Sequence, residues 1–555
     1  MSAAIRDHGH YYSRAALALF YLLVAILASW PLALHLRTHL PIGSEAPATV
    51  ALFNLWTLRW NADRLLAGYA GYWQAPIFYP LAGAFALSEP QPATGLVFAP
   101  LWLLGGDEVL AYNLVLLLAL AANGAAAGRL MTTLGAPRGP SLLAGALAVA
   151  LPFAAYELGV LQLIMLFPIW LALDALVRFR RRPALGTALA LGAALALAFL
   201  TCEYYGAFAV VVLGLSALAL LPWAGLGRPA AGNLLIGLAL AALLLLPVLP
   251  AQAQFSAAFA RGDATIAQNS AQAADYLRLP PGALGAGLPW LRASGGSGQT
   301  LYPGTGLLLL ALGGAAAGWR GRRRWVLFAL VGCGVALLIS FGLNLRLAGW
   351  APYQLLRALV PGFRQLRSPF RAAALLQALL VTLAGLALAG LWRWRAPLGR
   401  WLAVALTAGA LLEVWVVPAP LYRFPRERMA EPWIGWLATQ PPGAVAIAPF
   451  PASGAAGDYE PTAVAMLQAF GHRHPLANGY SGFFPPAYLR LREAMLGFPN
   501  AASLAELRDA GVVYVVVDRA WASPARQAQL DRLHAELMPL FDGDAASVYR
   551  LAARP

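Results

Sequence analysis

Residues 111–132 read AYNLVLLLALAANGAAAGRLMT, and this stretch decides the class of the protein. It carries a single charged side chain, Arg129, among residues that are mostly Ala and Leu. A helix needs about 20 consecutive apolar residues to cross the roughly 30 Å hydrocarbon core of a bilayer. The sequence therefore predicts a membrane span at this position.

Similar apolar runs recur along the whole chain. Of the 555 residues, 60% are hydrophobic and 11% are charged, and the mean hydropathy is +0.64. Soluble domains carry about 25% charged residues, so we predict an α-helical polytopic membrane protein with about eleven spans. The other ten runs lie at about 15–36, 140–156, 159–178, 184–200, 205–222, 232–250, 304–319, 325–343, 371–392 and 401–418.

One apolar run does not fit this pattern. Residues 92–106 contain two prolines and are too short for a usual span. If this segment crossed the bilayer, the charge pattern downstream would be inverted. We predict a re-entrant or interfacial segment here, with a short true span as the alternative.

The charged residues predict how the chain is oriented. The formal net charge is +15, and all 39 basic residues are arginines. They gather in short clusters between apolar runs, which is typical of cytoplasmic loops and argues against nucleic-acid binding. The N-terminus is then cytoplasmic and the C-terminus extracytoplasmic. The clusters are Arg178 with 180–182, Arg320 with 322–324, and Arg393 with Arg395 and Arg400.

The chain is predicted to divide near residue 418. Residues 1–418 form a membrane domain with outer loops at 37–110, 251–303 and 344–370. The tail, 419–555, holds 12 of the 24 acidic residues, and its strands and helices alternate, which indicates a soluble extracytoplasmic α/β domain. The predicted strands are 444–449, 511–518 and 547–551, and the predicted helices are 430–440, 501–510 and 525–541.

The first outer loop contains an aromatic segment, residues 53–63, reading FNLWTLRWNAD. Phe53, Trp56 and Trp60 recur at intervals of three and four residues and so share one helical face. Because Trp is favoured at membrane interfaces, we expect this helix to lie in the interface. Asp63 has a simpler explanation in an ion pair with Arg59, four residues earlier.

Four short motifs in chain order resemble the C-type glycosyltransferase (GT-C) superfamily, and more closely a subgroup of bacterial GT-C-like membrane proteins. They are Asn54 to Asn61 (NLWTLRWN), Ile77 to Pro80 (IFYP), Ala111 to Asn113 (AYN) and Arg367 to Arg371 (RSPFR). The resemblance covers about residues 1–418 and, loosely, the tail. It implies a bacterial cytoplasmic membrane protein that uses a polyprenyl-phosphate sugar as donor and works on the outer face.

The resemblance also implies an acid in the first outer loop as catalytic base or metal ligand, and Glu45 is the matching position. The adjacent second acid that relatives often carry is missing from Ser44-Glu45-Ala46. Glu157 and Glu203, at tight span ends, are candidates for a second acid. The remaining candidates contact substrate: Asp63, Trp56, Trp60, Arg367 and Arg371, the two arginines beside the lipid phosphate. The metal is unknown, with a divalent cation as one candidate, and the acceptor is a glycan, a lipid or a protein.

Two alternatives remain open. The first is a non-catalytic GT-C-like scaffold, and the second is a transporter or flippase of lipid-linked sugars. A transporter predicts acids near the bilayer midplane and internal repeats, whereas the nearest acid, Glu413, lies near a span end. In the tail, His472 and His474 are interpreted as a loop pair, and the aromatic stretch 477–486 either contacts a glycan or packs the tail onto the membrane part.

Overall fold

The structure is a computed structural model that describes residues 2–44, 47–220, 227–256, 260–280, 282–288, 296–395 and 397–553. The chain forms two compact units. The first consists of Met1–Arg37 and Tyr112–Leu421, and the second of Thr38–Ala111 and Tyr422–Pro555. The structure thus groups the first predicted outer loop with the tail, whereas the sequence-based division assigned that loop to the membrane domain.

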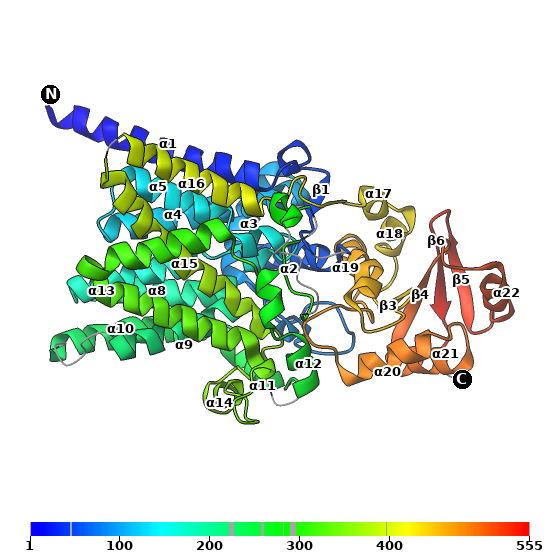
Figure 1. Ribbon diagram of the computed structural model, residues 1–555. Coiled ribbons are helices and arrows are strands. Elements are labelled where there is room, and N and C mark those ends of the chain that lie inside the picture. Colours follow the sequence, from blue (N-terminus) through cyan, green and yellow to red (C-terminus); the bar gives the residue numbers. More distant parts are fainter. Residues whose placement is uncertain are drawn as a thin grey trace. The chain divides into compact units, whose positions relative to one another are not determined.

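The first unit is a helical bundle, in which α15 packs against α5, α13 and α16 (Figure 1). Its α-helices are α1 (Ser2–Ala28), α4 (Glu108–Thr133, starting in the second unit), α5 (Arg138–Val149), α6 (Pro152–Tyr156), α7 (Phe167–Arg181), α8 (Leu185–Thr201), α9 (Glu203–Leu220), α10 (Arg228–Leu245), α11 (Leu249–Ser256), α12 (Asp263–Gln268), α13 (Thr305–Phe341), α14 (Tyr353–Leu359), α15 (Ala373–Arg393) and α16 (Leu398–Val414). Short 3₁₀ turns join them: η1 (Leu32–Leu34), η3 (Leu161–Ile164), η5 (Ala273–Leu277), η6 (Leu284–Gly287), η8 (Gly342–Asn344) and η9 (Pro369–Ala372).

Within the described residues, six helical segments are long and apolar enough to cross a membrane. The chain is therefore a multi-pass membrane protein, while the number of eleven spans stays a prediction. The six segments are Glu108–Thr133, Arg138–Tyr156, Leu161–Arg181, Arg228–Leu245, Thr305–Asn344 and Pro369–Arg393. Shorter apolar helices lie at Ala15–Ala28, Pro92–Gly105, Leu185–Thr201 and Glu203–Leu218.

Helix α13 contains two antiparallel helices. A straight helix of its 37 residues would be about 55 Å long, far more than the bilayer core. The backbone at Arg322 is non-helical, with φ −136° and ψ 30°. A Cβ placed on Gly318 would lie 2.7 Å from Val326, a closeness that eight residues of straight helix do not allow. The predicted spans 304–319 and 325–343 are these two arms.

The arginine-rich loops meet at one end of the bundle. Arg181 donates to the carbonyl of Thr133 (2.5 Å), and Arg393 donates to the carbonyl of Gly135 (2.9 Å). Arg322, at the turn of α13, lies close enough to Arg181 and Arg393 to interact with them electrostatically. The predicted cytoplasmic clusters are therefore neighbours in space, which agrees with placing them on one side of a membrane.

An acid at this end neutralises part of the positive charge. Asp174 is fully buried and accepts from Arg129 (2.9 Å), Arg178 (2.8 Å) and the Thr133 hydroxyl (2.5 Å). A buried carboxylate needs such partners, because burial of an unpaired charge is costly. We therefore assign Asp174 to holding α4 against α7.

The second unit combines helices with a four-stranded sheet of order β3-β4-β6-β5. Strands β3 and β4 are parallel, and β6 is antiparallel to β4 and to β5. Its elements are β1 (His39–Pro41), α2 (Thr49–Leu66), η2 (Ala84–Leu87), α3 (Pro92–Gly105), β2 (Leu421–Arg423), α17 (Arg426–Met429), α18 (Pro432–Leu437), β3 (Ala444–Ala448), η10 (Ala456–Tyr459), α19 (Glu460–His472), α20 (Pro486–Met495), α21 (Ala501–Asp509), β4 (Val512–Asp518), α22 (Pro524–Arg532), β5 (Leu537–Asp542) and β6 (Ala546–Leu551).

The three predicted strands correspond to β3, β4 and β6, but the end of the predicted helix 525–541 is wrong. Helix α22 stops at Arg532, and residues 537–542 form strand β5 along β6. Pro539 disfavours a helix here, and at the edge of a sheet its missing N–H is tolerated.

The first loop is joined to this sheet by main-chain hydrogen bonds. Residues 475–478 lie beside β3, because Val445 donates to Pro475 and Ala477 donates to Val445, both at 2.8 Å. Residues 76–79 lie on the other side of that segment: Leu476 donates to Pro76 (2.9 Å) and Tyr79 donates to Leu476 (2.8 Å). The first loop thus contributes to the edge of a sheet whose strands come from the tail.

Helix α2 is buried rather than interfacial, which corrects the prediction for residues 53–63. Twelve of its 18 residues are buried, and it packs against α3 and α19. Neighbouring rings on its aromatic face stack on each other, and the centres of the Trp56 and Trp60 rings are 6.5 Å apart. Its polar side is also satisfied, since Asn61 donates to the carbonyl of Pro90 (2.7 Å). An aromatic face along one side of a helix indicates that this side is buried. In α2 the face is covered by other parts of the protein rather than by lipid.

The segment 92–106 forms helix α3, which has 14 residues. At 1.5 Å per residue it is about 21 Å long and so shorter than the bilayer core. Phe98 and Ala99 are buried, whereas Leu103 and Leu104 are exposed. The length fits the predicted re-entrant or interfacial segment better than a span.

Candidate functional site

The end of the bundle opposite the arginine-rich loops contains a tyrosine surrounded by basic side chains. Tyr204 is the second residue of α9, and it follows the extended residue Cys202, where α8 ends. Its side chain is almost buried, and its ring meets that of Phe208 edge to face, 5.9 Å away. The hydroxyl of Tyr204 accepts a hydrogen bond of 3.0 Å from the main-chain N–H of Arg367. This contact ties the start of α9 to the chain before α15.

Three arginines lie around Tyr204, and we call Arg261, Arg367 and Arg371 the arginine cluster. The guanidinium carbon of Arg371 lies 4.4 Å from the centre of the Tyr204 ring, a cation–π contact. Burial, together with the nearby charge of Arg367, lowers the pKa of Arg261 to about 10. Arg261 still carries its charge at neutral pH. The cluster therefore holds like charges close together, which an anionic ligand relieves.

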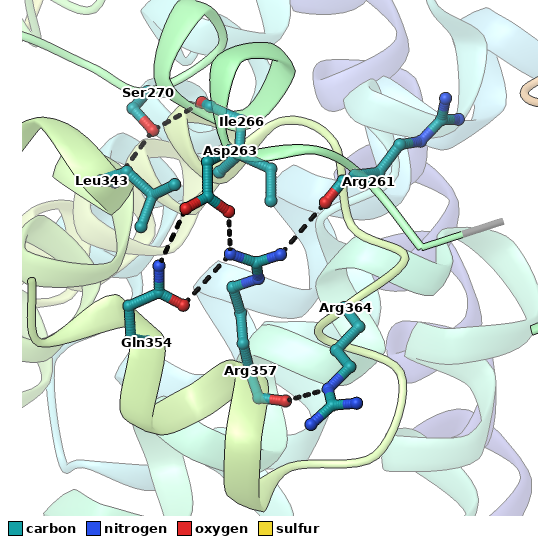
Figure 2. Close-up of polar contacts among 8 residues, drawn as sticks. All are labelled: Arg261, Asp263, Ile266, Ser270, Leu343, Gln354, Arg357 and Arg364. Atoms are coloured by element: carbon teal, nitrogen blue, oxygen red, sulfur yellow. Dashed lines mark hydrogen bonds and ion pairs between the residues drawn. The ribbon is translucent and has the colours of Figure 1, made fainter. Parts of the chain in front are cut away.

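The main chain of Arg261 is fixed from two sides, and Figure 2 shows one of the two contacts, that with Arg357. Its carbonyl accepts from Nη2 of Arg357 (3.0 Å), and its N–H donates to the carbonyl of Arg364 (3.0 Å). Nη1 of Arg357 also donates to Asp263 (2.5 Å) and to Gln354 (3.1 Å). Arg357 thus joins α14 to the chain before α12. Its contacts position the Arg261 backbone, and with it the cluster.

The three predicted catalytic acids have different outcomes. Glu45 lies outside the described residues. Glu157 follows the last residue of α6 and is buried. Glu203 is the first residue of α9, next to Tyr204, and accepts a hydrogen bond from Nε2 of Gln252. Arg367 and Arg371 both contact Tyr204, the residue that follows Glu203.

The residues that follow Glu45 are anchored within the second unit. The main-chain N–H of Ala48 donates to Oε2 of Glu460 (3.1 Å), and the hydroxyl of Thr49 donates to the carbonyl of Ala456 (2.8 Å). Both acceptors belong to the tail. The tail thus fixes the first loop within a few residues of the predicted catalytic position.

Two substrate-contact predictions are corrected by burial. The exposed fractions of Trp56 and Trp60 are 1% and 6%, so both side chains serve as core of the second unit and are unavailable to a substrate.

Asp63 forms an ion pair with the adjacent Arg64 rather than with Arg59. Arg59 instead pairs with Glu108 (3.6 Å) and lies 3.7 Å from the Trp102 ring. The prediction that Asp63 pairs with Arg59, four residues earlier, was therefore wrong.

The tail motifs are also part of the core. His472, which ends α19, is buried, and burial followed by the proximity of His474 lowers its pKa to about 3. His474 hydrogen-bonds through its ring to the carbonyl of Leu437 (3.0 Å). The Tyr480 ring meets that of Phe53 edge to face at 5.3 Å, so the aromatic stretch packs tail and first loop together.

Within the described ranges, no group of three or more His, Cys, Asp or Glu side chains could hold a metal ion.

Glu413 has a structural role. Its carboxylate accepts from the main-chain N–H groups of Thr305 and Gly306, each at 2.9 Å, and from the Tyr302 hydroxyl at 2.8 Å. A carboxylate at a helix start satisfies N–H groups that have no partner inside the helix. Glu413 therefore caps α13, which accounts for this acid without a transport function.

Sequence reasoning missed Arg261, Tyr204 and Arg357. A usable signal was nevertheless present. Arginines concentrate in cytoplasmic loops, whereas Arg261 and Arg357 lie in loops predicted to be extracytoplasmic. Basic residues that break the charge rule call for another explanation, and anion binding is the simplest.

The fold of this chain is similar to those of solved glycosyltransferases of the C-type. No protein-family model and no curated protein matches the sequence. The resemblance is therefore to solved structures, and at 11–18% identity it shows the fold alone.

Two of the similar proteins are glycosyltransferases from different domains of life. The arabinofuranosyltransferase AftD from Mycobacteria is 18% identical, with a TM-score of 0.60 over 97% of this chain. This chain spans only 40% of that protein's length. The oligosaccharyltransferase AglB from Archaeoglobus fulgidus, solved with an inhibitory peptide and a dolichol-phosphate, is 11% identical, with a TM-score of 0.54. The match covers 92% of this chain and 70% of that one.

Proposed function

We propose that the protein is a membrane glycosyltransferase that moves a sugar from a polyprenyl-phosphate carrier to an acceptor on the outer face of the bacterial cytoplasmic membrane. The observation that carries this proposal is the arginine cluster around Tyr204. Guanidinium groups bind phosphate well because their N–H groups match its oxygens. The fold is shared with glycosyltransferases, and the archaeal one was solved with a lipid phosphate.

The chemistry assigns a separate task to each group. The acceptor hydroxyl oxygen forms a bond to the anomeric carbon while the bond from that carbon to the phosphate oxygen breaks. Glu45 takes the hydroxyl proton as general base, and Glu157 or Glu203 serves as second acid. The leaving lipid phosphate gains negative charge, which Arg261, Arg367 and Arg371 stabilise.

The substitution Arg371→Gln tests the proposal. It removes a charge-assisted contact worth about 1.5–3 kcal/mol, so kcat/KM for the donor should fall about 10- to 150-fold. The measurement is transfer from a panel of radiolabelled polyprenyl-phosphate sugars in proteoliposomes. The matched control is Arg346→Gln, an exposed arginine between α13 and α14, which should leave transfer within about twofold. Folded wild-type protein without turnover on any donor would favour the scaffold or transporter alternatives.

Arg357→Gln tests the positioning of Arg261. The variant loses the contacts with the Arg261 carbonyl and with Asp263, so we expect about a five- to tenfold higher KM for the donor with little change in kcat. Asp263→Asn should raise KM only about twofold, because the Asp263 side chain is 67% exposed and exposed ion pairs contribute little. Equal effects of the two variants would contradict a positioning role for Arg357.

A further inference from the structure

The second unit contains a cavity that the proposed donor site does not use. It has a volume of about 190 Å³ and is lined by Gln74, Ala75, Pro76, Ile77, Tyr79, Leu81 and Pro475. Pockets for drug-sized ligands measure about 300–1,000 Å³, so this smaller cavity has room for about one small ring. Two of these lining residues, Gln74 and Tyr79, are exposed to solvent.

The lining residues indicate the chemistry of an occupant. None of these seven side chains carries a charge at neutral pH, so the lining offers no counter-ion to a phosphate or a carboxylate. It combines an amide and a phenol, which form hydrogen bonds, with apolar Ile, Leu and Pro surfaces. A neutral ring with hydroxyl groups on its edge and C–H groups on its face matches both kinds of surface. That combination is characteristic of a sugar.

The rim of the cavity is held rigidly. Phe78 has φ +56°, a left-handed conformation that is rare and costly for a residue with a large side chain. It is kept there by its N–H, which donates to the Asn478 carbonyl (3.1 Å), and by its ring, 4.8 Å from that of Tyr488. Oε1 of Gln74 accepts from the N–H of Gly83 (2.9 Å), which orients the amide. Such local strain concentrates at binding sites, where rigidity lowers the entropic cost of binding.

We propose that this cavity binds one sugar residue of a neutral glycan, with Tyr79 contacting the face of the ring and the Gln74 amide bonding a hydroxyl group. The inference deepens the proposed function, on which it rests for the role of the bound glycan as acceptor. Binding itself requires neither the arginine cluster nor a donor.

Saturation-transfer NMR on the full-length protein in detergent micelles tests the proposal. The probes are neutral oligosaccharides of pentoses and of hexoses, added without any donor. We expect saturation transfer to at least one probe, and about tenfold weaker binding with Tyr79→Ala, since tenfold corresponds to about 1.4 kcal/mol. Gln74→Ala should weaken binding by about three- to fivefold. Tyr69→Ala is the control, because Tyr69 is 43% exposed in the same loop but does not line the cavity, and it should change binding less than twofold.

The outcomes separate this site from the donor site. Arg371→Gln should keep full oligosaccharide binding even though its kcat/KM for transfer falls about 10- to 150-fold. Absence of saturation transfer to every probe would overturn the proposal, and so would equal losses with Tyr79→Ala and Tyr69→Ala. If oligosaccharides bound but the protein showed no transferase activity, the proposal of a sugar site would hold and the proposed function would be refuted.

Discussion

Glu45→Gln is expected to lower kcat for sugar transfer by about 10²- to 10⁴-fold, the usual contribution of a positioned general base. Glutamine keeps the size of the side chain but cannot accept the proton of the acceptor hydroxyl. Donor binding should change little, because the lipid phosphate is assigned to the arginine cluster. The measurement is single-turnover transfer with the best donor of the panel, so that chemistry is separated from binding.

Glu157→Gln and Glu203→Gln are the matched controls for this prediction. Each removes one carboxylate by the same isosteric change. If Glu45→Gln leaves turnover intact while one of these variants abolishes it, the base is that residue and the role of Glu45 is refuted. Glu203→Gln deserves a KM measurement as well, because Glu203 is adjacent to Tyr204, which the cluster surrounds.

Trp56→Ala is expected to destabilise the second unit by about 3–5 kcal/mol, the usual cost of removing a large buried aromatic side chain. Trp56 is 1% exposed and lies between the rings of Phe53 (5.8 Å) and Trp60 (6.5 Å). The readout is hydrogen exchange of peptides from α2, α19 and β3, because a chain of two units has no single unfolding midpoint. All three should lose protection together.

Tyr69→Ala is the control for this stability effect, since the Tyr69 side chain is largely exposed. It should change protection only near its own loop. If Trp56→Ala behaved in the same way, α2 would not be the core of the unit, and the interfacial helix expected from the sequence would be restored.

The sequence was most informative where a single physical rule acts alone. Apolar run length predicted the membrane helices, including the two arms of α13, and arginine clustering predicted loops that the structure brings to one end. The pairing of Asp63 was mispredicted because spacing along a helix permits a contact with Arg59 but does not exclude the adjacent Arg64, which is the partner observed.

The candidate site and the second unit depend on contacts between distant parts of the chain. Periodicity showed that Phe53, Trp56 and Trp60 share a face, but a period cannot state whether lipid or protein covers that face. Likewise, Arg367 and Arg371 were found through a local motif, whereas Arg261 comes from a separate loop. Only the fold brings it beside Arg367.

The union of residues 38–111 with residues 422–555 sets an order of events during synthesis. The ribosome adds about 5–20 residues per second, so the first loop waits tens of seconds for the tail that covers α2. During that interval an aromatic helix is present without its partners, and exposed apolar surface of this kind is prone to aggregation. A chain whose translation stops before residue 422 would retain this uncovered helix, and we expect cellular proteases to remove it quickly.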